Sequence, residues 1–151
     1  MPAGEDPFEL ERFLDAQAGG VFEQALRELR NARKHGHWMW FIFPQLRGLG
    51  SSELAQRYGI GSLAEAKAYL AHPVLGARLE QCAATLLGTG QRDPDAALGE
   101  IDAIKLRSSM TLFEAAARAD QLYAEVLERF YGGARDPRTL EMLSARNRDP
   151  S

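Results

Sequence analysis

The chain is poor in cysteine, in β-branched residues and in long apolar runs, and each shortage excludes a class of protein. A single cysteine, Cys82, excludes an intrachain disulfide and a cysteine-ligated zinc cluster. No apolar run approaches the ~20 residues that a membrane helix needs, and residues 1–11 are acidic, without the apolar core of a signal peptide. Valine and isoleucine are scarce, which disfavours β-strands. These shortages predict a cytoplasmic protein that does not enter the membrane.

Length and charge narrow the class further. The 151 residues, 45% hydrophobic and 26% charged, suffice for one globular domain with one core. The formal net charge of −3 creates no global positive field, so it disfavours nucleic acid as a partner. We expect residues 7–143 to form a single helical domain and residues 1–6 and 144–151 to be flexible termini.

Helical patterns dominate the chain and predict an all-α, compact single-domain bundle of about seven to eight helices. Apolar residues recur at i, i+3, i+4 and i+7, and capping signals occur at Ser51 or Ser52, Ser62 and Asp93. The expected helices span approximately residues 8–17, 22–34, 52–58, 62–71, 73–86, 96–117, 120–131 and 136–143. The aromatic run 37–44 has no clean period, so it fits a buried strand or a buried helical turn.

One expected helix carries polar residues on its apolar face. On a wheel of about 100° per residue, Asp102, Lys105 and Ser109 of the stretch 101–117 lie in the same arc as Ile101. Burying an ion costs several kcal/mol unless the ion is paired. Either Asp102 and Lys105 therefore pair across one turn, or these groups line a polar pocket.

Two other helices repeat this anomaly. Gln17 lies on the apolar face of the first helix, and the second helix would bring Arg33 close to Phe22 and Leu26. The second helix also ends in the cations Arg30, Arg33, Lys34 and His35, and His37 follows them. They fit either the negative end of the helix dipole or a bound ligand.

The aromatic run offers the same choice between structure and function. Trp38, Trp40, Phe41 and Phe43 form the densest apolar cluster of the chain, next to His37. Such a cluster is usually core. Alternatively, its ring faces could stack a planar base while neighbouring cations hold phosphates.

Several motifs resemble one known family over about residues 7–143. They are Phe13-x-x-Ala16-Gln17, His37-Trp38-Met39-Trp40-Phe41-Ile42-Phe43-Pro44-Gln45-Leu46-x-Gly48-Leu49-Gly50, Tyr69-Leu70-Ala71-His72-Pro73-Val74-Leu75-Gly76-x-Arg78-Leu79, Asp102-x-x-Lys105-Leu106-x-Ser108-Ser109-Met110-Thr111-Leu112-Phe113, and Asp136 with Thr139-Leu140. The chain resembles the domain of unknown function 1810 family, which consists of small, mostly bacterial proteins. The resemblance implies a compact all-helical domain, likened to armadillo or HEAT-type packing, and brings no established activity. Ala32 stands where we expect glycine in this family.

The motif residues coincide with the polar anomalies of the helical wheels, and this predicts a shared pocket. The candidate catalytic residues are Asp102, His37 and Lys105. The candidate ligand-binding residues are Gln17, Lys34, Trp38, Gln45, Ser108 and Ser109. We expect no metal site and no resident cofactor.

Cations, an aromatic ring, amides and hydroxyls together suit a phosphate- or ribose-bearing small molecule. We expect a ligand of the nucleotide or ADP-ribose type, which the protein binds or hydrolyses with a water activated by Asp102 or His37. The alternative is a non-enzymatic helical protein–protein interaction module, with the aromatic run as its exposed docking patch and an unidentified partner.

Overall fold

The structure, a computed structural model, describes residues 6–148, and within this range the chain is all-α, as predicted. Ten helices occur in the described range: α1 (Glu11–Gln17), α2 (Val21–Arg30), α3 (Met39–Ile42), α4 (Glu53–Arg57), α5 (Leu63–Ala71), α6 (Leu75–Gly88), α7 (Pro94–Leu98), α8 (Glu100–Ala116), α9 (Leu122–Tyr131) and α10 (Pro137–Arg148). Ten exceeds the expected number for two reasons. The aromatic run contributes the helical turn α3, and Gly99 divides the stretch 96–117 into α7 and α8.

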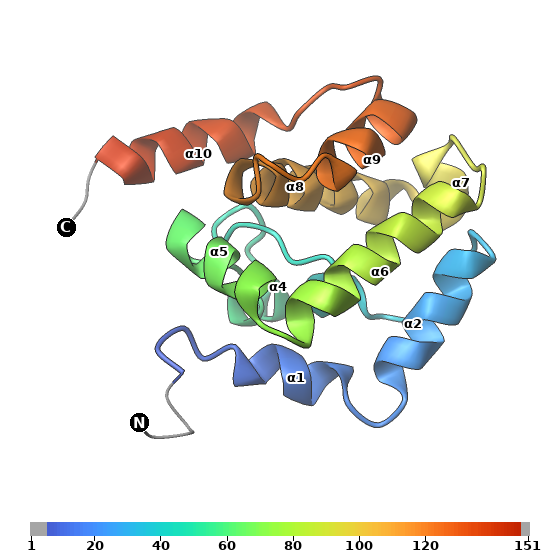
Figure 1. Ribbon diagram of the computed structural model, residues 1–151, viewed down its shortest axis with the longest axis horizontal. Helices are drawn as coiled ribbons and strands as arrows, with labels where there is room; N and C mark the ends of the chain where they lie inside the picture. The colour runs from blue at the N-terminus through green and yellow to red at the C-terminus, as the bar shows by residue number, and fades with distance from the viewer. Residues whose placement is uncertain (1–5, 149–151) are drawn as a thin grey trace.

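Helix α8 is the centre of the bundle, because α5, α7, α9 and α10 all pack against it. Helix α6 crosses the front of the molecule and contacts α2, α5 and α9, while α10 lies along the upper edge (Figure 1). Within the core, Tyr69 of α5 contacts Phe13 of α1 and Phe113 of α8, with ring centroids 5.1 and 5.4 Å apart. These fully buried rings join three helices that are distant in sequence.

The helix starts that the capping signals predicted are confirmed. Ser52 Oγ accepts a hydrogen bond from the Ala55 N–H, and Ser62 Oγ accepts one from the Glu65 N–H. Asp93 caps α7, whose first residue is proline. Local side-chain chemistry therefore determines where these helices begin.

Helix α2 ends at Arg30, four residues before the expected end at Lys34. Its last turn closes with hydrogen bonds from Ala32 N–H to Leu29 O and from Arg33 N–H to Glu28 O, each 3.0 Å. This is the Schellman pattern, in which the residue after the cap is left-handed. Ala32 occupies that position with a φ of +49°, which is the conformation that the expected glycine adopts without strain.

Residue burial corrects two expectations from the helical wheels, one on α8 and one after α2. Every residue from Ser108 to Phe113 is buried, whereas Ile101 is 72% exposed and Ile104 is 69% exposed. A wheel assumes that one face is covered along the whole helix, but from Glu100 to Arg107 only Ala103 and Leu106 are buried. Arg33, which the wheel put near Phe22, is exposed because α2 has already ended.

Helix α10 continues to Arg148, beyond the expected end at residue 143, so residues 144–148 are helical rather than an irregular tail. The rest of the expected flexible termini, residues 1–5 and 149–151, lies outside the described residues. Among the helices that the structure describes, none has the length and apolar character needed to cross a membrane.

Candidate functional site

An open groove of about 500 Å³ lies between the loop that follows α2 and the start of α8. We call it the ion-pair groove. Its lining consists of Lys34, His37, Trp40, Leu98, Gly99, Glu100, Ile101, Asp102 and Lys105. The loop is held against α7 by a hydrogen bond of 2.9 Å from the Lys34 N–H to Ala97 O. The groove thus brings together all three candidate catalytic residues and one candidate ligand-binding residue, Lys34.

Two ammonium groups share one carboxylate on the wall of this groove. Lys34 Nζ lies 2.7 Å from Asp102 Oδ2, and Lys105 Nζ lies 3.5 Å from Asp102 Oδ1. The side chains of Lys34, Asp102 and Lys105 are 9%, 17% and 21% exposed, respectively. Lys105 and Asp102 pair across one turn of α8, and both also line the groove. The ion pair and the polar pocket, which the sequence offered as alternatives, therefore occur together. The three groups carry a net charge of +1.

The aromatic run is partly core and partly groove. Trp38 is only 2% exposed, which confirms the structural interpretation for that ring, whereas Trp40 is half-buried and lines the groove. Lys34 Nζ lies 5.0 Å from the Trp38 ring centroid, and Lys105 Nζ lies 4.5 Å from that of Trp40. Each lysine therefore contacts Asp102 and one indole, which restrains its ammonium group.

Glu28 of α2 orders the loop that carries Lys34 and His37, and the sequence analysis did not identify it. Its Oε1 accepts hydrogen bonds from His35 N–H (2.7 Å), Gly36 N–H (2.8 Å) and Trp38 Nε1 (2.9 Å). Burial raises the pKa of this carboxyl, but the donors of Gly36, Gln24, His35 and Trp38 outweigh burial and lower the pKa to about 2. The only sequence signal for this role was that Glu28 is an acidic residue beside the apolar residues of α2.

Gln17 is buried but does not line the ion-pair groove, which corrects its assignment to the shared pocket. Its Nε2 donates to Phe41 O at 2.8 Å, and its Oε1 accepts from Arg78 NH1 at 3.1 Å. The amide therefore joins α1 to the end of α3 and to α6. The amide thus belongs to a buried polar network that connects three helices.

Three further candidates also lie outside the groove. Gln45 borders a separate hollow of about 10 Å³, which is no larger than one water needs. Ser108 Oγ donates to Asp136 Oδ2 at 3.1 Å, and that oxygen also accepts from the Thr139 N–H at the start of α10. Ser109 is fully buried in α8, and its Oγ has no hydrogen-bond partner among the described residues. A helical wheel predicts which side of a helix a residue occupies, but it does not predict which neighbouring helix packs against that side.

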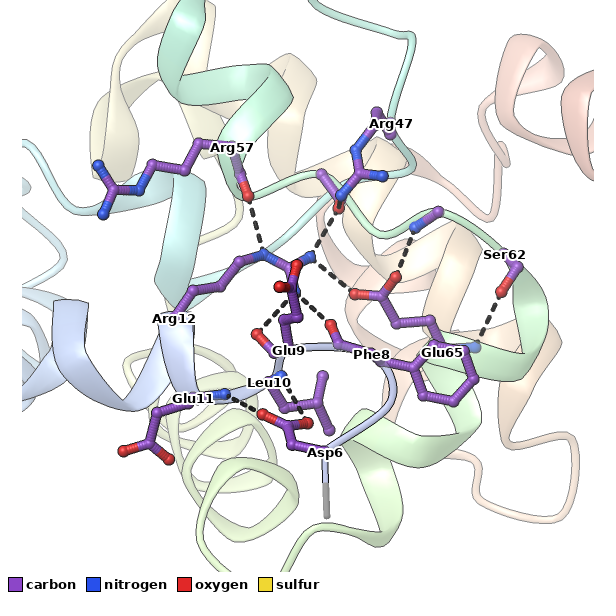
Figure 2. A network of polar contacts seen from close by, with 12 residues as sticks. Asp6, Phe8, Glu9, Leu10, Glu11, Arg12, Arg47, Arg57, Ser62 and Glu65 are labelled. Atoms are coloured by element: carbon purple, nitrogen blue, oxygen red, sulfur yellow. Dashed lines mark hydrogen bonds and ion pairs between the residues drawn. The ribbon is translucent and has the colours of Figure 1, made fainter. Parts of the chain in front are cut away.

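A second polar network, centred on Arg12, has a structural role (Figure 2). The guanidinium donates to four carbonyls, those of Phe8, Glu9, Arg57 and Gly59, and to the Glu65 carboxylate at 2.7 Å. These five hydrogen bonds use all five of its N–H groups. The network holds the start of α1 against the segment between α4 and α5, and it leaves no donor for a ligand.

Within residues 6–148, no three histidine, cysteine, aspartate or glutamate side chains lie close enough together to hold a metal ion. Cys82 is buried, and burial raises the pKa of its thiol to about 12, so this thiol is not a nucleophile near neutral pH. The chemistry of the described site therefore rests on the ion pairs, His37 and Trp40.

Comparisons with known proteins agree with this structure. The crystal structure of the conserved hypothetical protein Rv1873 from Mycobacterium tuberculosis is 52% identical to this chain. It superposes with a TM-score of 0.89, and the match covers 92% of this chain and 99% of that one. No curated protein matches the chain. The family model described as "protein of unknown function (DUF1810)" matches residues 7–143, so the chain belongs to the DUF1810 family.

Proposed function

We propose that the ion-pair groove binds a phosphate- or ribose-bearing small molecule of the nucleotide type in the cytoplasm. The observation that carries the proposal is the local charge imbalance: Lys34 and Lys105 share the single carboxylate of Asp102, whereas the exposed Glu100, which also lines the groove, forms no ion pair with either lysine. In a partly desolvated site a surplus ammonium favours an anionic partner. A phosphate oxygen supplies that partner and accepts several hydrogen bonds at once.

The other walls of the groove suit the same ligand. The first turn of α8 borders the groove, and its dipole adds positive potential near the lysines. Trp40 offers a half-buried indole and His37 an exposed imidazole, which suit a ribose or a base. The volume of about 500 Å³ lies within the range of small-molecule sites.

Binding has more support than hydrolysis. Both Asp102 oxygens are already engaged in ion pairs with ammonium groups, which lowers the ability of this carboxylate to take a proton from a water. His37 is exposed and has no hydrogen-bond or ion-pair partner among the described residues. If the protein hydrolyses its ligand, His37 is the group to act as general base, and His37→Ala lowers turnover far more than it lowers affinity.

The test is a thermal-shift and calorimetric panel of ATP, ADP, ADP-ribose and inorganic pyrophosphate. At a concentration of 100 Kd a bound ligand stabilises the native state by about 2.7 kcal/mol. We expect at least one of these ligands to stabilise the wild type and Lys105→Ala to reduce that effect. Lys67→Ala, at an exposed lysine of α5, is the matched control and leaves the effect unchanged. The proposal fails if no ligand of the panel binds, or if Lys105→Ala binds like the wild type.

A second candidate is the non-enzymatic interaction module, which one observation favours. Ile101 and Ile104 are one turn apart on α8 and are both about 70% exposed. An exposed apolar pair on a helix suits a protein partner. The test is sedimentation of the wild type and of Ile104→Glu. A concentration-dependent dimer that the substitution abolishes supports this role, and a wild type that stays monomeric contradicts self-association through this pair.

A further inference from the structure

A second hollow of about 370 Å³ lies beside the ion-pair groove, and His37 lines both. We call it the glycine hollow. Its lining consists of Gly19, Gly20, Val21, Gln24, Gly36, His37, Trp38 and Phe41. It therefore lies between the start of α2 and the loop that Glu28 orders.

The glycine hollow is bounded by rings and by backbone without side chains. The Trp38 indole is fixed by the hydrogen bond from its Nε1 to Glu28 and by the Lys34 ammonium over its ring. Gly36 packs directly against this indole, since a Cβ at Gly36 would lie 2.9 Å from Trp38 Cδ1. Gly19 and Gly20 both have positive φ, and a Cβ at either would meet nothing within 4 Å. The result is a mainly apolar recess in which Phe41 is the partly accessible ring, because Trp38 is only 2% exposed.

The two hollows are also coupled through Lys34 and Trp38. Lys34 lines the ion-pair groove, and its ammonium contacts the indole that lines the glycine hollow. A ligand that spans His37 would therefore meet cations at one end and, at the other, an apolar wall that includes the half-buried Phe41 ring. Aromatic faces bind the flat rings of nucleobases with little dependence on the base.

We propose that the glycine hollow is the subsite for the base of a nucleotide whose phosphates lie in the ion-pair groove. This inference rests on the proposed function and specifies its ligand as one with a planar ring on one side of His37 and a phosphate on the other. The Gln24 amide already bonds to Glu28 and to Arg27, so it is not free to read the edge of a base.

The test compares ADP, adenosine and inorganic pyrophosphate by calorimetry on the full chain. We expect ADP to bind the wild type about tenfold more tightly than pyrophosphate, the gain that stacking of one base provides. Val21→Trp fills the glycine hollow and removes this tenfold advantage, while pyrophosphate binding stays unchanged. Glu23→Trp, at an exposed position of the same helix, is the control and retains the advantage.

The outcomes separate this inference from the proposed function. Equal affinities of the wild type for ADP and pyrophosphate overturn the base subsite and leave the phosphate site intact. Adenosine binding that Val21→Trp abolishes, with no binding of pyrophosphate, supports the base subsite and overturns the phosphate site. If none of the three compounds binds, both are overturned. If circular dichroism shows that Val21→Trp is unfolded, Val21→Met replaces it, because methionine fills less of the hollow. Val21→Met must then weaken the binding of ADP more than the binding of pyrophosphate.

Discussion

Lys34 and Asp102 form an ion pair of 2.7 Å between the loop after α2 and the first turn of α8. Their side chains are 9% and 17% exposed, so water screens this pair less than a surface pair. Lys105 approaches the same carboxylate from within α8, at 3.5 Å. The charges of the site therefore also attach the loop to the helical core, and their removal affects both stability and binding.

We predict that the coupling between Lys34 and Asp102 exceeds that between Lys105 and Asp102. The reason is that Lys34 is closer to the carboxylate and more buried. Double-mutant cycles of Lys34→Ala and Lys105→Ala, each with Asp102→Ala, are measured by urea denaturation. We expect about 1–3 kcal/mol for the first pair and below about 1 kcal/mol for the second. Equal couplings would contradict this assignment of the stronger pair.

We predict that Glu28 makes the stability of the protein pH-dependent in the acid range. Its pKa falls from 4.5 to about 2 on folding, so its stabilising effect is complete above pH 4.5 and is lost as the pH falls from 4.5 towards 2. Glu28→Gln removes this dependence and costs about 1–3 kcal/mol at neutral pH, because charged acceptors of buried N–H groups are lost. The measurement is the free energy of unfolding between pH 2 and 7 for both proteins. Parallel curves would exclude this role of Glu28.

We predict that Ala32→Gly stabilises the protein. Ala32 has a φ of +49° in the Schellman turn that ends α2, and this conformation costs an alanine about 1 kcal/mol. The expected gain is therefore up to about 1 kcal/mol, reduced by the greater freedom of glycine in the unfolded chain. Ala18→Gly is the matched control: Ala18 is exposed with φ −75° and ψ 170°, so the same change there destabilises. A loss of stability in both variants would refute the strain argument.

We predict that Gln17→Leu lowers stability without weakening ligand binding. The substitution leaves Phe41 O without its side-chain donor and removes one acceptor of Arg78. The expected cost is about 1–3 kcal/mol. The free energy of unfolding and the affinity for whichever probe binds the wild type are measured together. A folded Gln17→Leu variant that no longer binds the probe would show that Gln17 belongs to the binding site.

The helix caps show which interactions could be predicted from the sequence alone. Ser62 and Asp93 bind N–H groups two or three residues ahead, so the sequence contains both partners of each interaction. Asp102 and Lys105 were likewise identifiable, since their spacing of three residues places them together on any helix. Their third partner, Lys34, was named as a candidate, but no local rule gives a pairing across 68 residues.

The candidate residues that do not line the groove were misassigned because their partners lie far away in the sequence. Gln17, Ser108 and Asp102 are all polar candidate residues on helices, and nothing in the local sequence distinguishes their roles. The distinction comes from the partner that packing supplies: Arg78 for Gln17, Asp136 for Ser108 and Lys34 for Asp102. Ile101 shows the same limit for apolar residues, because its exposure depends on where the neighbouring helices end.

The sequence by itself determined the helical class, most helix starts and the set of polar residues that lie on apolar helix faces. These properties depend on periodicity and on bonds between near neighbours in the chain. Only the tertiary structure decided which of those residues bond to one another and which face a hollow, and it revealed Glu28 as the carboxylate that orders the loop beside the site. Such contacts join segments far apart in the chain, and they follow from how whole helices pack rather than from any local pattern.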